Sequence, residues 1–311
     1  MRGFLTFVGL SVGWLMLAVA GVAIWLHYTA SRGTVAIYAT ALVPSALVIG
    51  AVGLVLFLAM RRWIAVSLSV VAVAVLIYTQ FPLWVSQTVP AGERFTVVSA
   101  NLQLGRANVD DLAAIADDAD LVSLQEVTPE ELARIRASAL VTRFRYEYAQ
   151  PDPGAAGSML LSRTELRDTQ RVPNTNHLSA LTSVPGAPQT RVLAVHPPAP
   201  RQGYSSEWAA SLALLRDYLH ALPEGPVIVA GDFNATWDHK QFRDLLGDGF
   251  SDATAQSGSG YQLTFPTDEL GGVPLAGIDH VVVRGFQAAM VSTQDLPGSD
   301  HRALKVSLVA S

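Results

Sequence analysis

The nine residues Pro226-Val-Ile-Val-Ala-Gly-Asp-Phe-Asn234 decide the fold, because a short apolar run ends there in a glycine, a carboxylate and a carboxamide. The β-branched run from Val227 to Ala230 predicts a buried strand. Gly231 permits a tight exit with close approach of another backbone. Asp232 and Asn234 then stand at the carboxyl end of the strand, where polar residues often contact ligands in layered α/β proteins. An Asx turn that closes the strand is the alternative interpretation.

Five other apolar runs also carry polar residues at one end. These residues are Asn101, Glu126 and His196 at the ends of their runs, and Asp279 and the Asp300-His301 pair at the starts of theirs. Between them the pattern predicts alternating helices and strands. One predicted helix begins near Asn108, and three others cover Thr128 to about Ala139, Ser206 to His220, and about His239 to Leu246. Residues Val141 to Tyr148 form a predicted strand. Residues Asn174 to Gln189 form a predicted polar loop near the substrate.

This order of motifs resembles the endonuclease/exonuclease/phosphatase superfamily, which includes DNase I-like nucleases, sphingomyelinases and inositol-phosphate phosphatases. The matching motifs are Asn101, Gln125-Glu126, G-S-M-L-L-S from Gly157 to Ser162, His196, G-D-F-N, I-D-H and S-D-H, which together span residues 95 to 309. The resemblance and the alternating elements imply an α/β fold, a four-layer sandwich in which two mixed sheets pack face to face with helices outside. The activity implied is hydrolysis of a phosphoester.

Residues 1–90 and 91–311 differ sharply in composition. The first segment holds four charged residues, all arginine, whereas the second holds 17 basic and all 26 acidic side chains and has a formal net charge of −9. We expect a membrane region in the first segment and a catalytic domain of single-core size in the second. The chain contains no Cys, which excludes disulfides, thiolate zinc sites and cysteine nucleophiles but leaves the compartment open.

Three uncharged stretches predict transmembrane helices, each long enough to cross ~30 Å of hydrocarbon. They cover about residues 4–26, 34–60 and 63–85. A cleaved signal peptide is the alternative for the first stretch, because Arg2 precedes it and Ala18-Val-Ala20 resembles a cleavage site. The apolar sequence continues to Leu26, however, beyond the length of an ordinary signal core.

The short loops predict the orientation. Arg2 and the Arg61-Arg62 pair lie on one side of the predicted helices, and Arg32 lies on the other. Because positive residues favour the cytoplasm, the amino terminus is expected inside and the catalytic domain outside, in a multi-pass protein of the cell membrane. The short linker from Ser86 to Gly92 is expected to hold that domain near the lipid.

Hydrolysis of a phosphoester requires a metal ion at a non-bridging oxygen, an activated water and donors for the charge on phosphorus. Glu126 is the first candidate metal ligand, with Asp300 and Asn101 completing an oxygen-rich site that suits Mg²⁺ or Mn²⁺. Taken one by one, Glu126 could instead cap the helix at Thr128, and Asn101 could close a turn.

His301 is the candidate general base, or the electrostatic partner of the attacking water, because imidazole titrates near neutral pH. The resemblance assigns to Asp279 the fixing of its tautomer and to Asp232 the positioning or deprotonation of the water. Asn234, together with Asn101, is expected to bind the substrate phosphate, and His196 to stabilise the phosphoryl oxygens or assist the leaving group. His280 is interpreted as a packing or supporting residue; His177, His220 and His239 receive no role.

Three functions remain open at this stage. The first is a membrane-anchored, metal-dependent phosphoesterase that acts on a phosphate or pyrophosphate carried by a membrane lipid; the arrangement also resembles three-span actinobacterial proteins of this superfamily associated with teicoplanin resistance, the VanJ group. The second is an anchored nuclease, which the acidic domain disfavours although Arg191, Arg201, His239 and Lys240 lie near motif ends. The third is a catalytically silent binding or assembly module. No protein partner is predicted.

Overall fold

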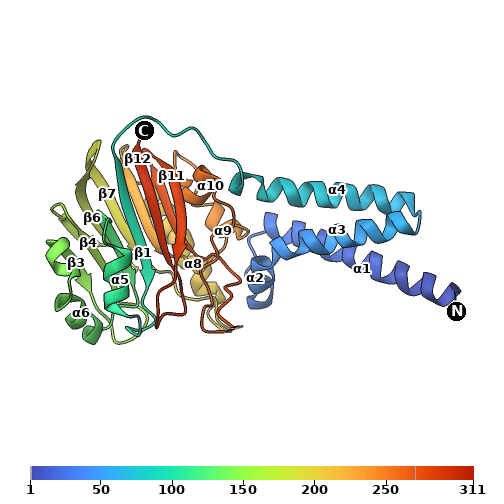
Figure 1. Ribbon diagram of the computed structural model, residues 1–311, viewed down its shortest axis with the longest axis horizontal. Helices are drawn as coiled ribbons and strands as arrows, with labels where there is room; N and C mark the ends of the chain where they lie inside the picture. Colours follow the sequence, from blue (N-terminus) through green and yellow to red (C-terminus); the bar gives the residue numbers. More distant parts are fainter. Residues whose placement is uncertain (1, 270) are drawn as a thin grey trace.

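The computed structural model describes residues 2–269 and 271–311 and shows an α/β sandwich preceded by apolar helices (Figure 1). Two six-stranded sheets pack face to face, and helices cover their outer faces. This confirms the predicted fold class. The helical bundle extends from one side of the sandwich, and the carboxyl terminus lies at an edge of the sandwich, at the end of its last strand.

The first sheet contains the amino-terminal strand of the sandwich at its centre. In spatial order its strands are β11 (Phe286–Gln294), β12 (Ala303–Ala310), β1 (Arg94–Asn101), β2 (Leu121–Gln125), β4 (Ser158–Ser162) and β3 (Tyr146–Gln150). Only β1 and β2 are parallel among these described pairs. Their register pairs Asn101 with Gln125, so both strands end at the same edge of the sheet.

The second sheet is built around the strand of the G-D-F-N motif. In spatial order its strands are β5 (Arg167–Arg171), β6 (Leu178–Val184), β7 (Ala187–Val195), β8 (Val227–Asp232), β10 (Asp279–Arg284) and β9 (Ser251–Asp252). Strands β7 and β8 are parallel, while β10 runs antiparallel to β8 and pairs Asp279 with Asp232. The central strands of both sheets therefore bring polar residues to their ends.

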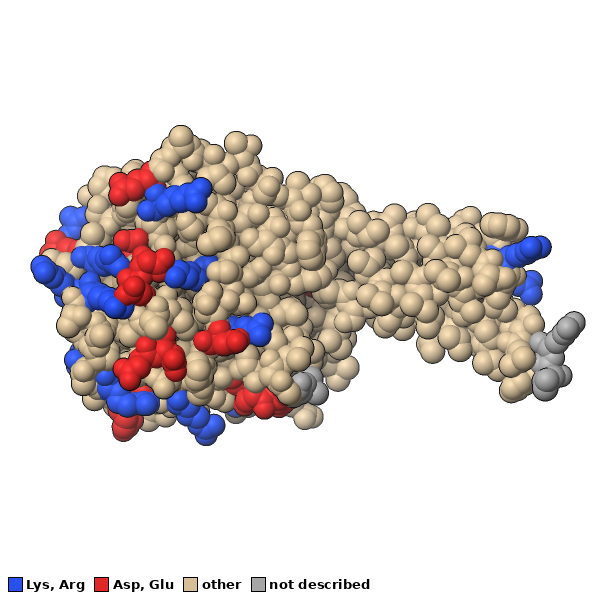
Figure 2. All heavy atoms as spheres, in the orientation of Figure 1, with Lys and Arg blue, Asp and Glu red and all other residues tan. Residues whose placement is uncertain are grey.

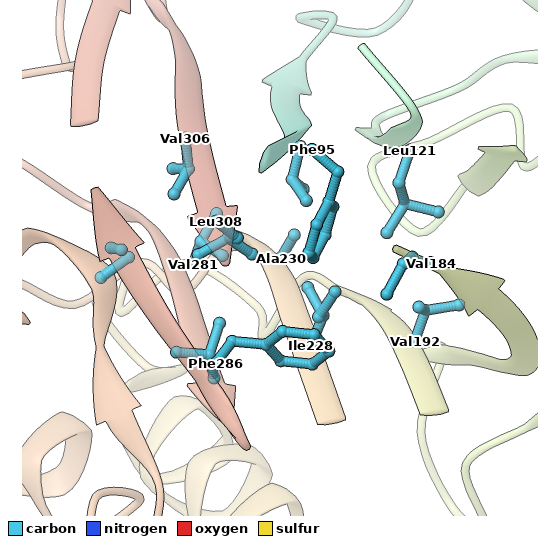
Figure 3. Packing of buried hydrophobic residues seen from close by; sticks show 14 of the residues in the cluster. Phe95, Leu121, Val184, Val192, Ile228, Ala230, Val281, Phe286, Val306 and Leu308 are labelled. Atoms are coloured by element: carbon cyan, nitrogen blue, oxygen red, sulfur yellow. The ribbon is translucent and has the colours of Figure 1, made fainter. Parts of the chain in front are cut away.

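Figure 3 shows the apolar layer between the sheets, in which Phe95 and Leu121 of one sheet face Ile228 and Val192 of the other. The outer face of the first sheet is covered by α5 (Val109–Ile115), α6 (Pro129–Arg136) and α7 (Leu140–Arg143), and that of the second by α8 (Ser205–His220) and α9 (Lys240–Arg243), while α10 (Ala253–Ser257) follows β9. As the sequence predicts, the side chains of Asn108 and Thr128 cap α5 and α6.

Several predicted elements differ from the structure. The residues 174–189, predicted as a polar loop, contribute β6 and the start of β7, which form a hairpin around Pro185-Gly186. The first half of the predicted strand 141–148 is the short helix α7, because Leu140 turns into the core beneath α6. The helix predicted over 239–246 shortens to α9.

The amino-terminal helices are α1 (Arg2–Tyr28), α2 (Thr34–Ala41), α3 (Val43–Ala59) and α4 (Trp63–Gln80), followed by the 3-10 turn η1 (Phe81–Leu83). Two helices, Gly3–Tyr28 and Trp63–Leu83, are long and apolar enough to cross a membrane, in agreement with the sequence. The second predicted span is instead broken, because α2 and α3 meet at an angle of 66°. Pro44 lies in the first turn of α3 and has no N–H to continue the hydrogen bonding of α2.

The bundle is joined to the sandwich by buried polar contacts. Asp238, only 1% exposed, accepts hydrogen bonds from His27 Nδ1 at 2.7 Å and Gln80 Nε2 at 2.9 Å. The indole N–H of Trp237 donates to the carbonyl oxygen of Thr79 at 2.9 Å. The ends of α1 and α4 are therefore fixed to the chain that follows the G-D-F-N motif.

An apolar contact reinforces this junction. Ile37 of α2 is 1% exposed and belongs to the same buried cluster as Trp208 of α8 and Phe242 of α9. His239 donates from Nε2 to the carbonyl oxygen of Ile37 at 3.0 Å and accepts at Nδ1 from the backbone N–H of Thr236. A helix of the bundle thus completes the outer core of the second sheet.

Candidate active site

The eight residues that sequence analysis singles out lie at one edge of the sandwich, on the ends of the central strands. Asn101 ends β1, Glu126 follows β2, His196 follows β7, Asp232 ends β8 with Asn234 just beyond it, Asp279 begins β10, and Asp300 and His301 precede β12. The strand register accounts for this meeting point, because β1 ends beside β2 and β8 ends beside the start of β10.

His301 lies between two buried carboxylates. Its Nδ1 is 2.8 Å from Asp279 Oδ2, and its Nε2 is 3.7 Å from Asp232 Oδ2. The hydrogen bond at Nδ1 fixes the ring and turns Nε2 toward Asp232. Burial by itself would lower the pKa of His301, but Asp279, Asp232 and Asp300 outweigh it and raise the pKa to about 10. The imidazole is therefore protonated at neutral pH in this arrangement.

Asp232 is also in contact with a second histidine and with Asn101. His196 Nε2 lies 3.5 Å from Asp232 Oδ2, and Asn101 Nδ2 donates to the same oxygen at 3.1 Å. Burial favours the neutral acid, yet His301 and His196 lower the pKa of Asp232 below its ordinary value. Asp232 is thus an anion held between two imidazoles.

Glu126 lies on the more exposed side of the cluster. Its Oε1 accepts from Asn101 Nδ2 at 3.2 Å and lies 3.9 Å from His196 Nε2, and its Oε2 accepts from the backbone N–H of Leu104 at 2.9 Å. The backbone of Glu126 has a positive φ of 58°, which is uncommon for residues other than glycine, asparagine and aspartate. Such strain persists where surrounding contacts fix it, frequently at functional sites.

The turn after β8 fixes Asp232 and uses part of Asn234. The backbone N–H of Asn234 donates to Asp232 Oδ1 at 2.7 Å, an Asx turn, and its side-chain amide donates to the carbonyl oxygen of Pro197 at 3.0 Å. The Asx turn and the site role are therefore compatible, because the turn orients the carboxylate. A Cβ atom at Gly231 would overlap the carbonyl oxygen of Val195 on β7, which explains the glycine in the motif.

The negative charge of Glu126 acts on the carboxyl group of Asp300. Burial, and the negative charges of Glu126 and Asp268, raise the pKa of Asp300 although His301 acts in the opposite direction. Partly exposed oxygen ligands that repel one another suit a hard cation such as Mg²⁺ or Mn²⁺. Asp232, Asp279 and His301 also have potential ligand atoms within 4.8 Å of one another, but His301 Nδ1 already binds Asp279.

Sequence analysis missed three groups that support this site. Ser299 Oγ donates to the carbonyl oxygen of Asn101 and accepts from the backbone N–H of His301, so it links the end of β1 to the segment before β12. His177, assigned no role, accepts at Nδ1 from the backbone N–H of His196 at 3.2 Å. Asp268 lies in the loop between α10 and β10, and its charge helps to raise the pKa of Asp300. Ser299 lies within the S-D-H motif, but no pattern marks His177 or Asp268.

His280, interpreted as a packing residue, lies away from the cluster. Its Nε2 donates to the carbonyl oxygen of Ala235 at 2.9 Å, and its ring packs on Phe233 and Phe242. Successive residues of a strand face opposite sides, so Asp279 and His280 cannot both enter the site.

The residues of this site lie within a stretch of sequence that matches a known protein family. The family model described as the endonuclease/exonuclease/phosphatase family matches residues 98–301, which contain all eight residues. The chain belongs to this family. Endonuclease/exonuclease/phosphatase proteins hydrolyse phosphoester bonds, and the carboxylates here form a possible metal site.

Solved structures of this fold agree with the assignment. A humanised D. rerio TDP2 has a TM-score of 0.58 and 18% identity, covering 69% of this chain and 98% of that one. A 3′ phosphatase, NExo from Neisseria, bound to a product DNA hairpin, has a TM-score of 0.52 and 16% identity, with 68% and 98% covered. An endonuclease/exonuclease/phosphatase from Beutenbergia cavernae has a TM-score of 0.52 and 18% identity, with 70% and 72% covered. A search of curated proteins found no match. At these identities the likeness establishes the fold.

Proposed function

We propose that this protein is a membrane-anchored, divalent-cation-dependent phosphoesterase that removes a phosphate or pyrophosphate group from a membrane lipid at the extracytoplasmic face. The observation that carries this proposal is the convergence of Glu126, Asp232 and His301 on a domain whose neighbouring loops pack against apolar helices. A silent binding module would not require this complete set of charged groups in contact.

The residues divide into a side that holds a cation and a side that handles protons. Glu126 and Asp300 would hold Mg²⁺ or Mn²⁺, and the ion when bound would neutralise charge on a phosphoryl oxygen. Asn101 directs its side-chain N–H groups at Glu126 and Asp232, and His196 Nε2 lies beside Asp232. From these positions both side chains can donate hydrogen bonds to oxygens of a substrate phosphate. The free proton of the Asn234 amide can add a further donor.

Asp232 and His301 are placed to orient and polarise the attacking water. Asp232 is anionic and can accept a hydrogen bond or a proton, while His301, kept protonated by Asp279, supplies positive charge beside it. This favours the electrostatic role for His301 over that of a general base, and it gives Asp232 the role of acceptor. Asp279 keeps Nε2 of His301 directed at the reaction centre.

A lipid substrate agrees better with the surface than a nucleic acid does. In Figure 2 the charged side chains gather on the part of the domain far from the bundle, and the surface beside the bundle is nearly free of them. Of the four groups that could form a basic patch, Arg191 and Lys240 are paired with Asp168 and Asp244, and His239 is buried against α2. These three groups therefore add little free positive charge beside the motifs that could select a phosphate backbone.

The proposed orientation follows from the bundle. The loop with Arg61 and Arg62 lies at the free end of the bundle, opposite the sandwich (Figures 1 and 2). Positive residues at that end favour the cytoplasm. The resemblance of the arrangement to the VanJ group also supports a substrate of the outer membrane face.

The test compares substrates with the purified full-length protein in detergent. We expect phosphate release from polyprenyl pyrophosphate or phosphatidic acid that requires Mg²⁺ or Mn²⁺ and stops with a chelator, and little cleavage of single- or double-stranded DNA. Glu126→Gln should raise the Mg²⁺ concentration needed, whereas Glu130→Gln, an exposed change on α6, should not. Efficient DNA cleavage without lipid-phosphate hydrolysis would instead establish the nuclease, and no hydrolysis of either would leave the binding module.

A further inference from the structure

A cavity of about 330 Å³ lies at the junction of the bundle and the sandwich. Ala41, Pro44 and Ser45, at the break between α2 and α3, form one wall together with Leu83. The domain contributes the segments 261–263 and 273–277, and polar residues including Asp238, Asp252 and His280 also line the cavity. This volume lies within the range of small-molecule and lipid-chain sites.

The inner end of the cavity reaches a residue of the active site. Asp279 contributes to its lining, and Asp279 Oδ2 is the oxygen that holds His301. Among the described residues, the other oxygen, Oδ1, is buried without a hydrogen-bond partner. The cavity therefore approaches the reaction centre from the side of the bundle.

The outer end of the cavity is apolar and accessible. Val273 and Leu275 are 60% and 50% exposed, although large apolar side chains gain about 1.5–3 kcal/mol from leaving water. Ser45 is exposed on the other wall, where the helix is broken. In the proposed anchored state this end faces the hydrocarbon of the bilayer, because α2 and α3 belong to the apolar bundle.

Hydrogen bonds between the bundle and the domain fix the distance between the two walls. Tyr261 donates its hydroxyl proton to Gln80 Oε1 at 3.2 Å, and burial raises the pKa of this hydroxyl to about 12. The backbone N–H of Gly260 donates to the carbonyl oxygen of Leu83 at 2.7 Å. The separation of the walls is thus fixed by the fold, so the cavity is preformed.

We propose that this cavity binds the hydrocarbon chain next to the phosphate of the lipid substrate, so that the bundle forms part of the substrate site. The inference rests on the proposed function and specifies how its substrate is recognised. A mostly apolar cavity that opens toward the bilayer and reaches an active-site carboxylate matches a hydrocarbon chain attached to a phosphate. The shared ligand chemistry is a long hydrocarbon, whether isoprenoid or acyl.

The absence of Cys from the chain permits a clean test by site-specific blocking. Ser45→Cys places one thiol in the cavity wall, and Val55→Cys places one at an exposed position of the same helix, roughly 15 Å farther along it. Both variants are treated with a bulky maleimide. Hydrolysis is measured on two pairs that differ only in chain: polyprenyl pyrophosphate against isopentenyl pyrophosphate, and phosphatidic acid against glycerol 3-phosphate.

We expect blocked Ser45→Cys to lose kcat/KM on the long-chain member by about tenfold or more, as for substrate groups excluded from an apolar pocket, and to keep its rate on the short member. Blocked Val55→Cys should keep both rates. The two pairs reveal whether the chain is isoprenoid or acyl. A direct readout accompanies them: with a chelator present, the long-chain lipid should slow maleimide reaction at Ser45→Cys and leave Val55→Cys unchanged.

Full long-chain activity in blocked Ser45→Cys, or an equal loss on long and short substrates, would overturn the role of the cavity. An unprotected thiol in the chelator experiment would do the same. If the unmodified wild-type protein hydrolyses neither lipid, the proposed function itself is wrong. That result is distinct from the results that would refute the role of the cavity.

Discussion

At the scale of single residues, the proposed mechanism relies on a histidine that its neighbours keep charged. His301 lies between Asp279 and Asp232, and its pKa of about 10 keeps it protonated through the neutral range. His301→Ala should therefore reduce turnover by about 10² to 10⁴ without unfolding the chain, because the charge beside the attacking water is lost. Steady-state rates with the proposed substrate and a thermal unfolding curve measure both quantities.

His220→Ala is the matched control for that variant. It makes the same chemical change at an exposed histidine outside the site, beside Asp248. Its rate should equal that of the wild type. Unchanged turnover in folded His301→Ala would remove His301 from the mechanism.

His177 predicts how stability depends on pH. Burial, and the nearby His196, lower its pKa to about 3 from an ordinary value of 6.5. The unfolded chain binds a proton that the folded chain refuses, so stability present above pH 6.5 is lost as the pH falls toward 3. Between pH 7.5 and pH 5 this residue should remove about 2 kcal/mol of stability.

His177→Asn tests this dependence, because its Oδ1 can still accept from the backbone N–H of His196. Denaturant unfolding at the two pH values should show a smaller loss for His177→Asn than for wild type, and His220→Asn should follow wild type. Equal losses in all three proteins would show that His177 does not set the acid limit.

The sequence predicts a set of residues that the fold brings together, but it does not predict their contacts. Strand ends and turn chemistry mark Asp232, Glu126 and His301, because apolar runs of limited length must end in polar residues at an edge. The support from His177 and Ser299 depends on register between strands distant in sequence. Local patterns carry no information on such pairings.

At the scale of elements, the buried contacts of Asp238 determine how firmly the bundle is attached. Asp238→Ala leaves His27 and Gln80 without their acceptor in a buried site. A buried group left without its hydrogen-bond partner commonly costs about 1–3 kcal/mol, so the unfolding temperature in detergent should fall clearly. Asp244→Ala, which removes the more exposed pair with Lys240, should cost about 0–1 kcal/mol. Similar unfolding temperatures for the two variants would contradict this account.

The elements that sequence analysis misread have physical explanations. Pro185-Gly186 indicates a turn, and here it is the two-residue turn of a hairpin rather than part of a long loop. Residues 34–60 are apolar enough for one membrane span, and that predicted span is bent near Pro44 into α2 and α3, which meet at 66°. Hydropathy counts apolar residues and does not register such a break.

At the scale of the whole molecule, the orientation of the chain can be measured independently of its chemistry. A reporter that is active only in the cytoplasm, fused after Ser311, should give no signal, since the carboxyl terminus belongs to the sandwich and the positive loop Arg61-Arg62 lies at the opposite end. The same reporter inserted in the loop at Arg61 should be active. A strong signal at Ser311 with none at Arg61 would invert the proposed topology.

The contact of Ile37 with Trp208 and Phe242 bears on the order in which the protein matures. A chain released without α2 would present an apolar hollow on α8 and α9, where Ile37 is now sealed from water. The final packing of α8 and α9 therefore includes a residue of the helices that precede the sandwich. A copy whose helices failed to insert into the membrane would then be incompletely packed. Proteases would degrade such a copy before it could act as a hydrolase in the wrong compartment.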